Sequence, residues 1–76
     1  MESYTGKIYD LDFIQASNWC QALILKDGDS QNIVVVTSDH RMQSILETAM
    51  IMSREIEVTY EGQNPSLLTR AKINVA

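Results

Sequence analysis

The apolar alternation near the start of the chain changes phase once, and this change restricts the possible folds more than any other feature. Apolar residues or glycine occupy alternate positions, first at Tyr4, Gly6 and Ile8 and then at Tyr9, Leu11 and Phe13. A period of two that slips by one residue indicates a β-bulge, here near Ile8 and Tyr9. Because barrels use such devices to bend and close their sheets, the pattern favours a small barrel.

Strand patterns recur along the rest of the chain. The predicted strands cover 4–14, 19–26, 32–37, 55–61 and 67–75. A run of branched residues over 33–36 favours strand over helix. Asp27-Gly28-Asp29-Ser30 is a turn signal between the second and third strands. In the fourth, Ile56, Val58 and Tyr60 are expected to point inward, and the fifth alternates apolar residues with Arg70 and Lys72.

One helix is predicted between the third and fourth strands. Ser38 or Asp39 is a suitable N-cap, since either side chain can accept a hydrogen bond from a free backbone N–H. Helical spacing gives one apolar stripe, made of Met42, Ile45, Leu46, Ala49 and Met50. Ile51 lies opposite the centre of the stripe and Met52 near its edge, so an apolar side chain is expected on the solvent side of the helix, where a partner would explain it.

The order β-β-β-α-β-β predicts a mainly β protein with one helix, forming a five-stranded OB-fold Greek-key barrel. An open antiparallel sheet with the helix on one face is the alternative. The chain has 76 residues, so 1–76 is one domain, and it buries only about 60% of its unfolded surface. A single cysteine, Cys20, cannot form an internal disulfide, which leaves self-association as a source of extra stability.

Charge and hydropathy exclude several function classes. Ten acidic residues against six basic ones give a net charge of −4, which makes nucleic acid an unfavourable partner, because its binding depends on Lys and Arg. No apolar run approaches the roughly 20 residues of a membrane span. With Met1 as the natural start, the absence of a signal peptide predicts a cytoplasmic protein; if Met1 replaces a removed signal peptide, the protein is secreted.

Catalytic chemistry has few candidates, and we expect no enzyme, no cofactor and no metal site. Cys20 and His40 are the one possible nucleophile and base pair, but a free cysteine inside a strand is usually a small buried hydrophobe. Asp10 and Asp12 share one face of a strand about 7 Å apart, as expected for a solvated face.

Trp19 is the best candidate for a binding residue, because it follows a polar loop and begins a strand at the barrel rim. A core position fits it equally well. The predicted ligand-binding residues are Asn18, Trp19, Asp39 and His40. The alternative function is a single-stranded nucleic-acid-binding OB domain, in which Arg54, Arg70 and Lys72 would join Trp19 and Tyr60 in one basic aromatic surface.

Two short motifs carry a family resemblance. Thr5-Gly6-Lys7-Ile8 and the helical Met42-Gln43-Ser44-Ile45-Leu46 are similar to the Thr-Gly-Lys-Ile opening and Leu-Gln-Ser-Leu-Leu helix of the receptor-binding B subunits of Shiga-type bacterial toxins. The resemblance implies a homopentameric ring of OB barrels whose helices line a central pore. The helix residues expected at the interface between copies are Ser44, Glu47, Thr48, Ile51 and Met52.

The chain also departs from that family. It lacks the family's second cysteine, its loop at 15–18 has no acidic residue, and His40 stands where the family has a tryptophan near the helix start. The family's glycan specificity therefore does not transfer. The resulting prediction is a non-catalytic oligomeric module that binds itself and a carbohydrate or partner protein.

Overall fold

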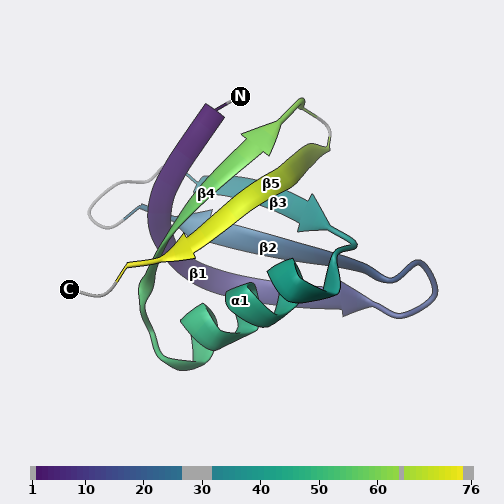
Figure 1. The fold of residues 1–76 in the computed structure, drawn as a ribbon, viewed down its shortest axis with the longest axis horizontal. Coiled ribbons are helices and arrows are strands. Elements are labelled where there is room, and N and C mark those ends of the chain that lie inside the picture. The colour runs from purple at the N-terminus through teal and green to yellow at the C-terminus, as the bar shows by residue number, and fades with distance from the viewer. Residues whose placement is uncertain (1, 27–31, 64, 75–76) are drawn as a thin grey trace.

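The described residues form five strands and one helix (Figure 1). The computed structural model describes residues 2–26, 32–63 and 65–74. The elements are β1 (Glu2–Ile14), β2 (Trp19–Leu25), β3 (Asn32–Thr37), α1 (His40–Ile51), β4 (Glu55–Glu61) and β5 (Ser66–Ile73). Their order confirms the predicted β-β-β-α-β-β sequence. The predicted turn at Asp27–Ser30, together with Val75, lies outside the described residues.

The strands close into a barrel in the order β1-β2-β3-β5-β4. All neighbouring strands are antiparallel except β3 and β5, which run parallel. A closed five-stranded barrel with its helix between β3 and β4 is the OB arrangement. The OB-fold prediction is therefore confirmed, and the open-sheet alternative is wrong.

β1 is long enough to join both halves of the barrel. Its first half pairs with β4 and its second half with β2, so the strand bends sharply between them (Figure 1). The pairing with β2 shifts register between Ile8 and Asp10, which confirms the predicted bulge. Tyr9 is the extra residue, and its side chain is 73% exposed. The sequence pattern predicts Tyr9 on the same face as Leu11. Tyr9 is not on that face, because the extra residue of a bulge does not follow the alternation of its strand.

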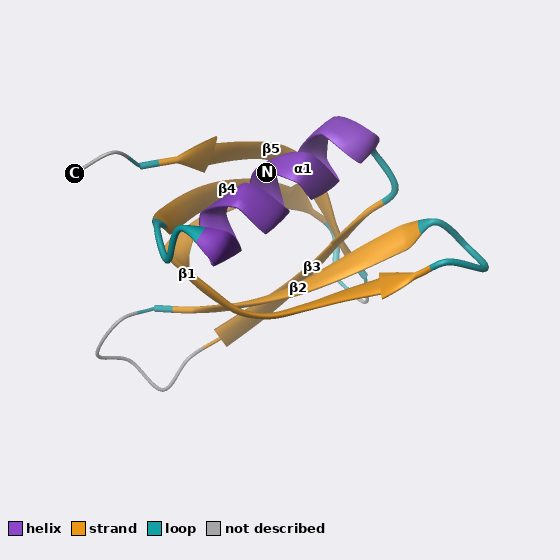
Figure 2. Ribbon diagram, turned by 90° about the horizontal axis from the view of Figure 1, so that it is seen from below, coloured by secondary structure: helices purple, strands orange, loops and turns teal. Residues whose placement is uncertain are grey.

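The core fills the barrel and the space beneath α1, which lies across the barrel (Figure 2). Its buried apolar residues are Cys20, Ala22, Ile24, Val35, Leu46, Ala49, Ile56, Val58 and Leu68. Ile56 and Val58 point inward as predicted, with Tyr60 half-buried beside them. The sequence places Met50 on the buried stripe of α1, but its side chain is 37% exposed, whereas Ala49 beside it in the last turn is fully buried.

A second bulge, in β5, is absent from the sequence prediction. Thr59 pairs with Arg70 while Tyr60 pairs with Leu68, so Thr69 is an extra residue in β5. The Thr69 hydroxyl donates a hydrogen bond to the carbonyl oxygen of Thr59 at 3.0 Å. The bulge turns Leu68 into the core while leaving Leu67 exposed.

Candidate functional site

The outer face of β2 and β3 carries the apolar side chains of Leu23, Val34 and Val36. Cys20, Ala22 and Ile24 point into the barrel, so the alternate residues of β2 point outward. The register places Gln21 opposite Val36 and Leu23 opposite Val34. This sheet face is the surface through which OB barrels commonly bind ligands.

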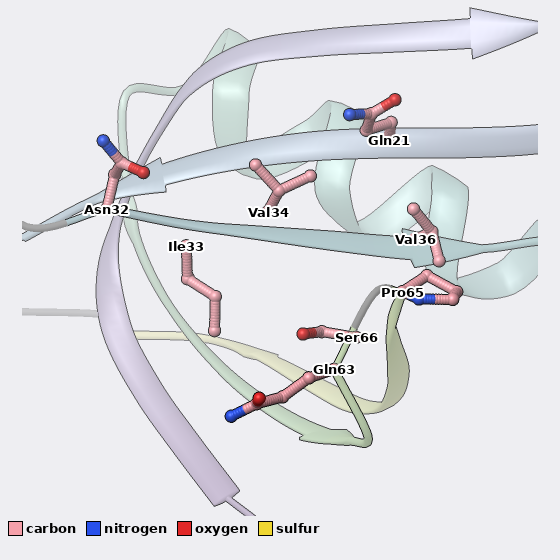
Figure 3. A pocket seen from close by; sticks show the side chains of 8 residues that line it. All are labelled: Gln21, Asn32, Ile33, Val34, Val36, Gln63, Pro65 and Ser66. Carbon is pink, nitrogen blue, oxygen red and sulfur yellow. The ribbon is translucent and has the colours of Figure 1, made fainter.

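A depression of about 640 Å³ lies beside β3 and faces the turn between β4 and β5. Figure 3 shows the residues that line it, which are Gln21, Asn32, Ile33, Val34, Val36, Gln63, Pro65 and Ser66. We call this depression the β3 groove. All of these lining residues are uncharged, with branched aliphatic side chains from β3 and amide or hydroxyl groups from both sides. The groove can therefore receive apolar groups and satisfy neighbouring polar atoms.

A smaller depression of about 190 Å³ adjoins the β3 groove. The two share Gln21 and Val34, and the smaller one adds Asp10, Asp12 and Leu23. Asp10 and Asp12 thus lie on one face of β1, as predicted. No basic residue is among the described residues that line either depression. In the described ranges, no three His, Cys, Asp or Glu side chains group as metal ligands.

The predicted ligand-binding residues gather at the other end of the site, around the start of α1. The Asp39 carboxylate accepts hydrogen bonds from the backbone N–H groups of Arg41 at 2.8 Å and Met42 at 3.0 Å. Asp39, rather than Ser38, is therefore the N-cap. These two hydrogen bonds satisfy backbone N–H groups that have no partner within the helix. Asp39 therefore has a structural role.

Gln43 ties the loop before β2 to the first turn of α1. Its side-chain amide donates to the carbonyl oxygens of Asn18 at 3.1 Å and Thr37 at 3.4 Å. Asn18 adopts a left-handed backbone conformation with φ of 59°, which asparagine tolerates well. The structure thus brings Asn18 beside the start of α1, where Asp39 and His40 lie.

Trp19 and His40 are both exposed at this end of the barrel. Trp19 is 36% exposed and pairs with Ile14 across the rim, so the rim position holds and the core position does not. None of the four predicted ligand-binding residues lines the two depressions described above. The rim and the β3 groove are therefore separate parts of the surface.

Cys20 has the properties of a core residue. Its side chain is buried, and burial, followed by the negative charges of Asp12 and Glu47, raises the pKa of the thiol. A raised pKa disfavours the thiolate, which is the nucleophilic form. Cys20 is therefore poorly suited to nucleophilic chemistry with His40.

Arg70 and Lys72, two basic residues of the nucleic-acid alternative, lie on β5, which does not pair with the strand that carries Trp19. The register places Lys72 opposite Glu57 and Arg70 opposite Thr59 on β4, whereas Trp19 lies on β2. Tyr60 is half-buried and lies opposite Glu2 of β1; burial first, and then this acidic neighbour, raise the pKa of Tyr60. The described part of β4 and β5 therefore offers a mixed-charge face, which suits phosphate binding poorly.

The solvent side of α1 carries the residues predicted at an interface between copies, namely Ser44, Glu47, Thr48, Ile51 and Met52, and all of them are exposed. Ile51 is 71% exposed, and Met50 and Met52 beside it are exposed as well. We call Met50, Ile51 and Met52 the apolar helix end. Three consecutive large apolar side chains in water form the kind of patch that marks an interaction site.

Sequence reasoning missed the β3 groove. Part of the groove can be predicted from the alternation of β2 and β3. Because Cys20 and Val35 point inward, Gln21, Val34 and Val36 must share the outer face. The opposite wall has no such signal. Gln63 and Ser66 approach β3 only because β5 runs parallel to it, which is a long-range pairing.

The one described helix is too short and too polar to cross a membrane. No protein-family model matches the chain, and neither a curated protein nor a solved structure matches it significantly.

Proposed function

We propose that this protein is a non-catalytic binding and assembly module that forms a ring of copies of itself, with five copies as in the toxin B subunits it resembles, and that presents a surface for a partner protein or carbohydrate. The observation that carries the proposal is the apolar helix end. Ile51 is 71% exposed next to two exposed methionines, on an element that otherwise buries its apolar residues.

The small size of the core supports the proposal that a second copy of the protein covers this patch. The largest fully buried side chains are Ile24, Leu46, Ile56, Val35 and Val58, which is a modest core for one domain. Because small domains bury a limited fraction of their surface, covering the apolar helix end with a neighbouring copy would add hydrophobic stabilisation. Helices that pack against other helices carry apolar residues on more than one face.

The binding half of the proposal is supported by the surface of the barrel. The β3 groove and the smaller depression beside it lie on the face that OB barrels use for ligands. Burial raises the pKa of the Cys20 thiol and Asp39 caps α1, which supports a non-catalytic role for these two residues. Binding is therefore the function that these side chains serve best.

Light scattering and sedimentation of the purified protein at tens of micromolar test the assembly. We expect a defined oligomer for the wild type and weaker association for Ile51→Glu, since a charge at a buried contact is costly. Tyr9→Glu is the matched control, because Tyr9 is 73% exposed on β1 rather than on α1. It should leave the oligomer intact. A monomeric wild type would contradict the proposal.

A further inference from the structure

β3 has an unpaired edge. One side of the strand pairs with β2 along its whole length, from Asn32 opposite Leu25 to Thr37 opposite Cys20. On its other side, the described residues of β5 pair only with Val35 and Val36. The stretch Asn32–Val34 therefore has no strand partner on that side among the described residues.

Among the described residues, the unpaired edge has main-chain groups without a strand partner. Successive residues of a strand direct their N–H and C=O groups to opposite sides. Either Ile33, or Asn32 together with Val34, consequently points both groups away from β2. A strand edge of this kind is a template for another extended chain, and proteins usually protect it with charged side chains or proline. Asn32, Ile33 and Val34 include neither.

The β3 groove lies along this same edge. Asn32, Ile33 and Val34 form one wall, and Gln63, Pro65 and Ser66 form the other. Figure 3 shows the side chain of Ile33 pointing from β3 toward the side where Gln63 and Ser66 lie. The groove is bounded on both sides, so a single extended segment can enter it, whereas the edge of a second barrel would meet the wall formed by Gln63 and Pro65.

Charge defines the occupant further. All lining residues of the groove are uncharged, and burying a charged side chain without a partner is costly. Asp10 and Asp12 line the adjoining depression, and the chain has a net charge of −4, so acidic segments are repelled. Alternate side chains of an extended segment would cover half-buried Ile33 on one face and exposed Val34 on the other.

We propose that the β3 groove binds an extended peptide segment of a partner protein by strand addition to Asn32–Val34, and that this segment carries uncharged β-branched or apolar side chains and no acidic residue. Main-chain hydrogen bonds to the β3 edge supply affinity, and the alternating side-chain positions supply selectivity. The site is separate from the apolar helix end, so it does not depend on self-association.

Selection from a displayed library of random short peptides on the wild-type protein, followed by fluorescence anisotropy of the enriched peptides, tests the proposal. We expect β-branched, non-acidic peptides. Val34→Lys should weaken their binding at least about fivefold, because it replaces an apolar side chain of the groove by a charged one, which would be buried without a partner by the added segment and which protects a strand edge. Ile14→Lys is the matched control, because Ile14 is 44% exposed and Val34 38%, and Ile14 lies outside the groove. It should bind as the wild type does.

N-methylation of the enriched peptides distinguishes strand addition from simple apolar burial. Methyl groups on alternate backbone nitrogens should abolish binding for one parity and leave it nearly unchanged for the other, since only one edge of the added strand faces β3. Gln63→Lys, on the opposite exposed wall, provides a second blocking variant if Val34→Lys fails to fold. The proposal would be overturned if no peptides were enriched. It would also be overturned if the blocked variants bound the peptides as well as the wild type does, or if neither pattern of N-methylation weakened binding.

Discussion

Gly6 of β1 packs against the main-chain carbonyl of Leu25 in β2. A β-carbon at Gly6 would overlap the carbonyl oxygen of Leu25 and lie 2.8 Å from its carbonyl carbon. At this point β1 leaves β4 for β2, because the next residue, Lys7, pairs with Glu55 on β4 and with Leu25 on β2. The absence of a side chain at Gly6 lets the two strands meet where the barrel turns.

Gly6→Ala should therefore destabilise the protein. The atoms in the way belong to the backbone of a paired strand and cannot rotate aside, so we expect a loss of about 1–3 kcal/mol in the free energy of unfolding, as for an overpacked core. Denaturant unfolding followed by circular dichroism measures it. Gly62→Ala is a useful comparison, since Gly62 meets an atom only at 3.4 Å but has φ of 79°; its cost would come from the backbone conformation alone. Unchanged stability of Gly6→Ala would contradict the close contact.

Ser53→Gly should stabilise the protein. α1 ends with the Ser53 N–H bonded to the Met50 carbonyl at 3.1 Å and the Arg54 N–H bonded to the Ala49 carbonyl at 2.9 Å, which is the Schellman pattern. Ser53 has φ of 53°, so glycine would relieve about 0.5–1 kcal/mol of backbone strain.

The same change inside the helix should have the opposite sign. Ser44→Gly places glycine in the middle of α1 and should cost about 0.5–1 kcal/mol, because serine has the higher helix propensity. Thermal unfolding of both variants provides the comparison. Equal shifts of the same sign would rule out the left-handed end at Ser53.

Gln43→Leu should loosen the loop before β2. The substitution keeps the size of the side chain but removes the amide that donates to the Asn18 and Thr37 carbonyls. We expect a loss of about 1 kcal/mol in the free energy of unfolding and faster amide exchange in residues 15–18. Ser44→Ala, at the next and exposed position, should leave amide exchange in residues 15–18 unchanged and should not lower the free energy of unfolding, because alanine is the better helix former.

The protein should lose stability at alkaline pH. Burial and acidic neighbours raise the pKa of Cys20, so the unfolded thiol ionises first, near pH 8.5 or so. Above that pH the unfolded state binds fewer protons than the folded state, and the free energy of unfolding falls until the folded thiol also ionises. Tyr60, whose pKa is also raised, adds a second decline above pH of about 10.

Cys20→Ala separates the two contributions. It removes a buried thiol, so its stability is lower where the wild-type thiol is protonated, and its decline should begin at a higher pH because only Tyr60 remains. Unfolding by urea across the pH range measures the slopes. A wild-type protein with constant stability through the thiol range, or a Cys20→Ala curve of identical slope, would contradict the expectation.

Most of the features that could be predicted from the sequence depend on residues that lie close together in the chain. The bulge at Ile8 and Tyr9, the Asp39 cap and the exposed Ile51 follow from spacing within a few residues, and each was anticipated, although Tyr9 itself points elsewhere. The bulge at Thr69 and the β3 groove arise from pairings between distant strands. No local pattern at Thr69 or Gln63 indicates which strand will lie beside it, so these features required the register of the closed barrel.

The division of β1 between two partners also constrains the order of events during synthesis. Its second half can pair with β2 as soon as that strand emerges. Its first half can pair only once β4 has been made, because Glu2 pairs with Tyr60 and Thr5 with Glu57. Contacts so far apart in sequence slow folding. Until α1 and β4 are in place, a sheet of β1, β2 and β3 alone leaves uncovered Ile24 and Val35, which are fully buried in the finished barrel. The barrel therefore closes late, and its unfinished half is the part that a chaperone would meet.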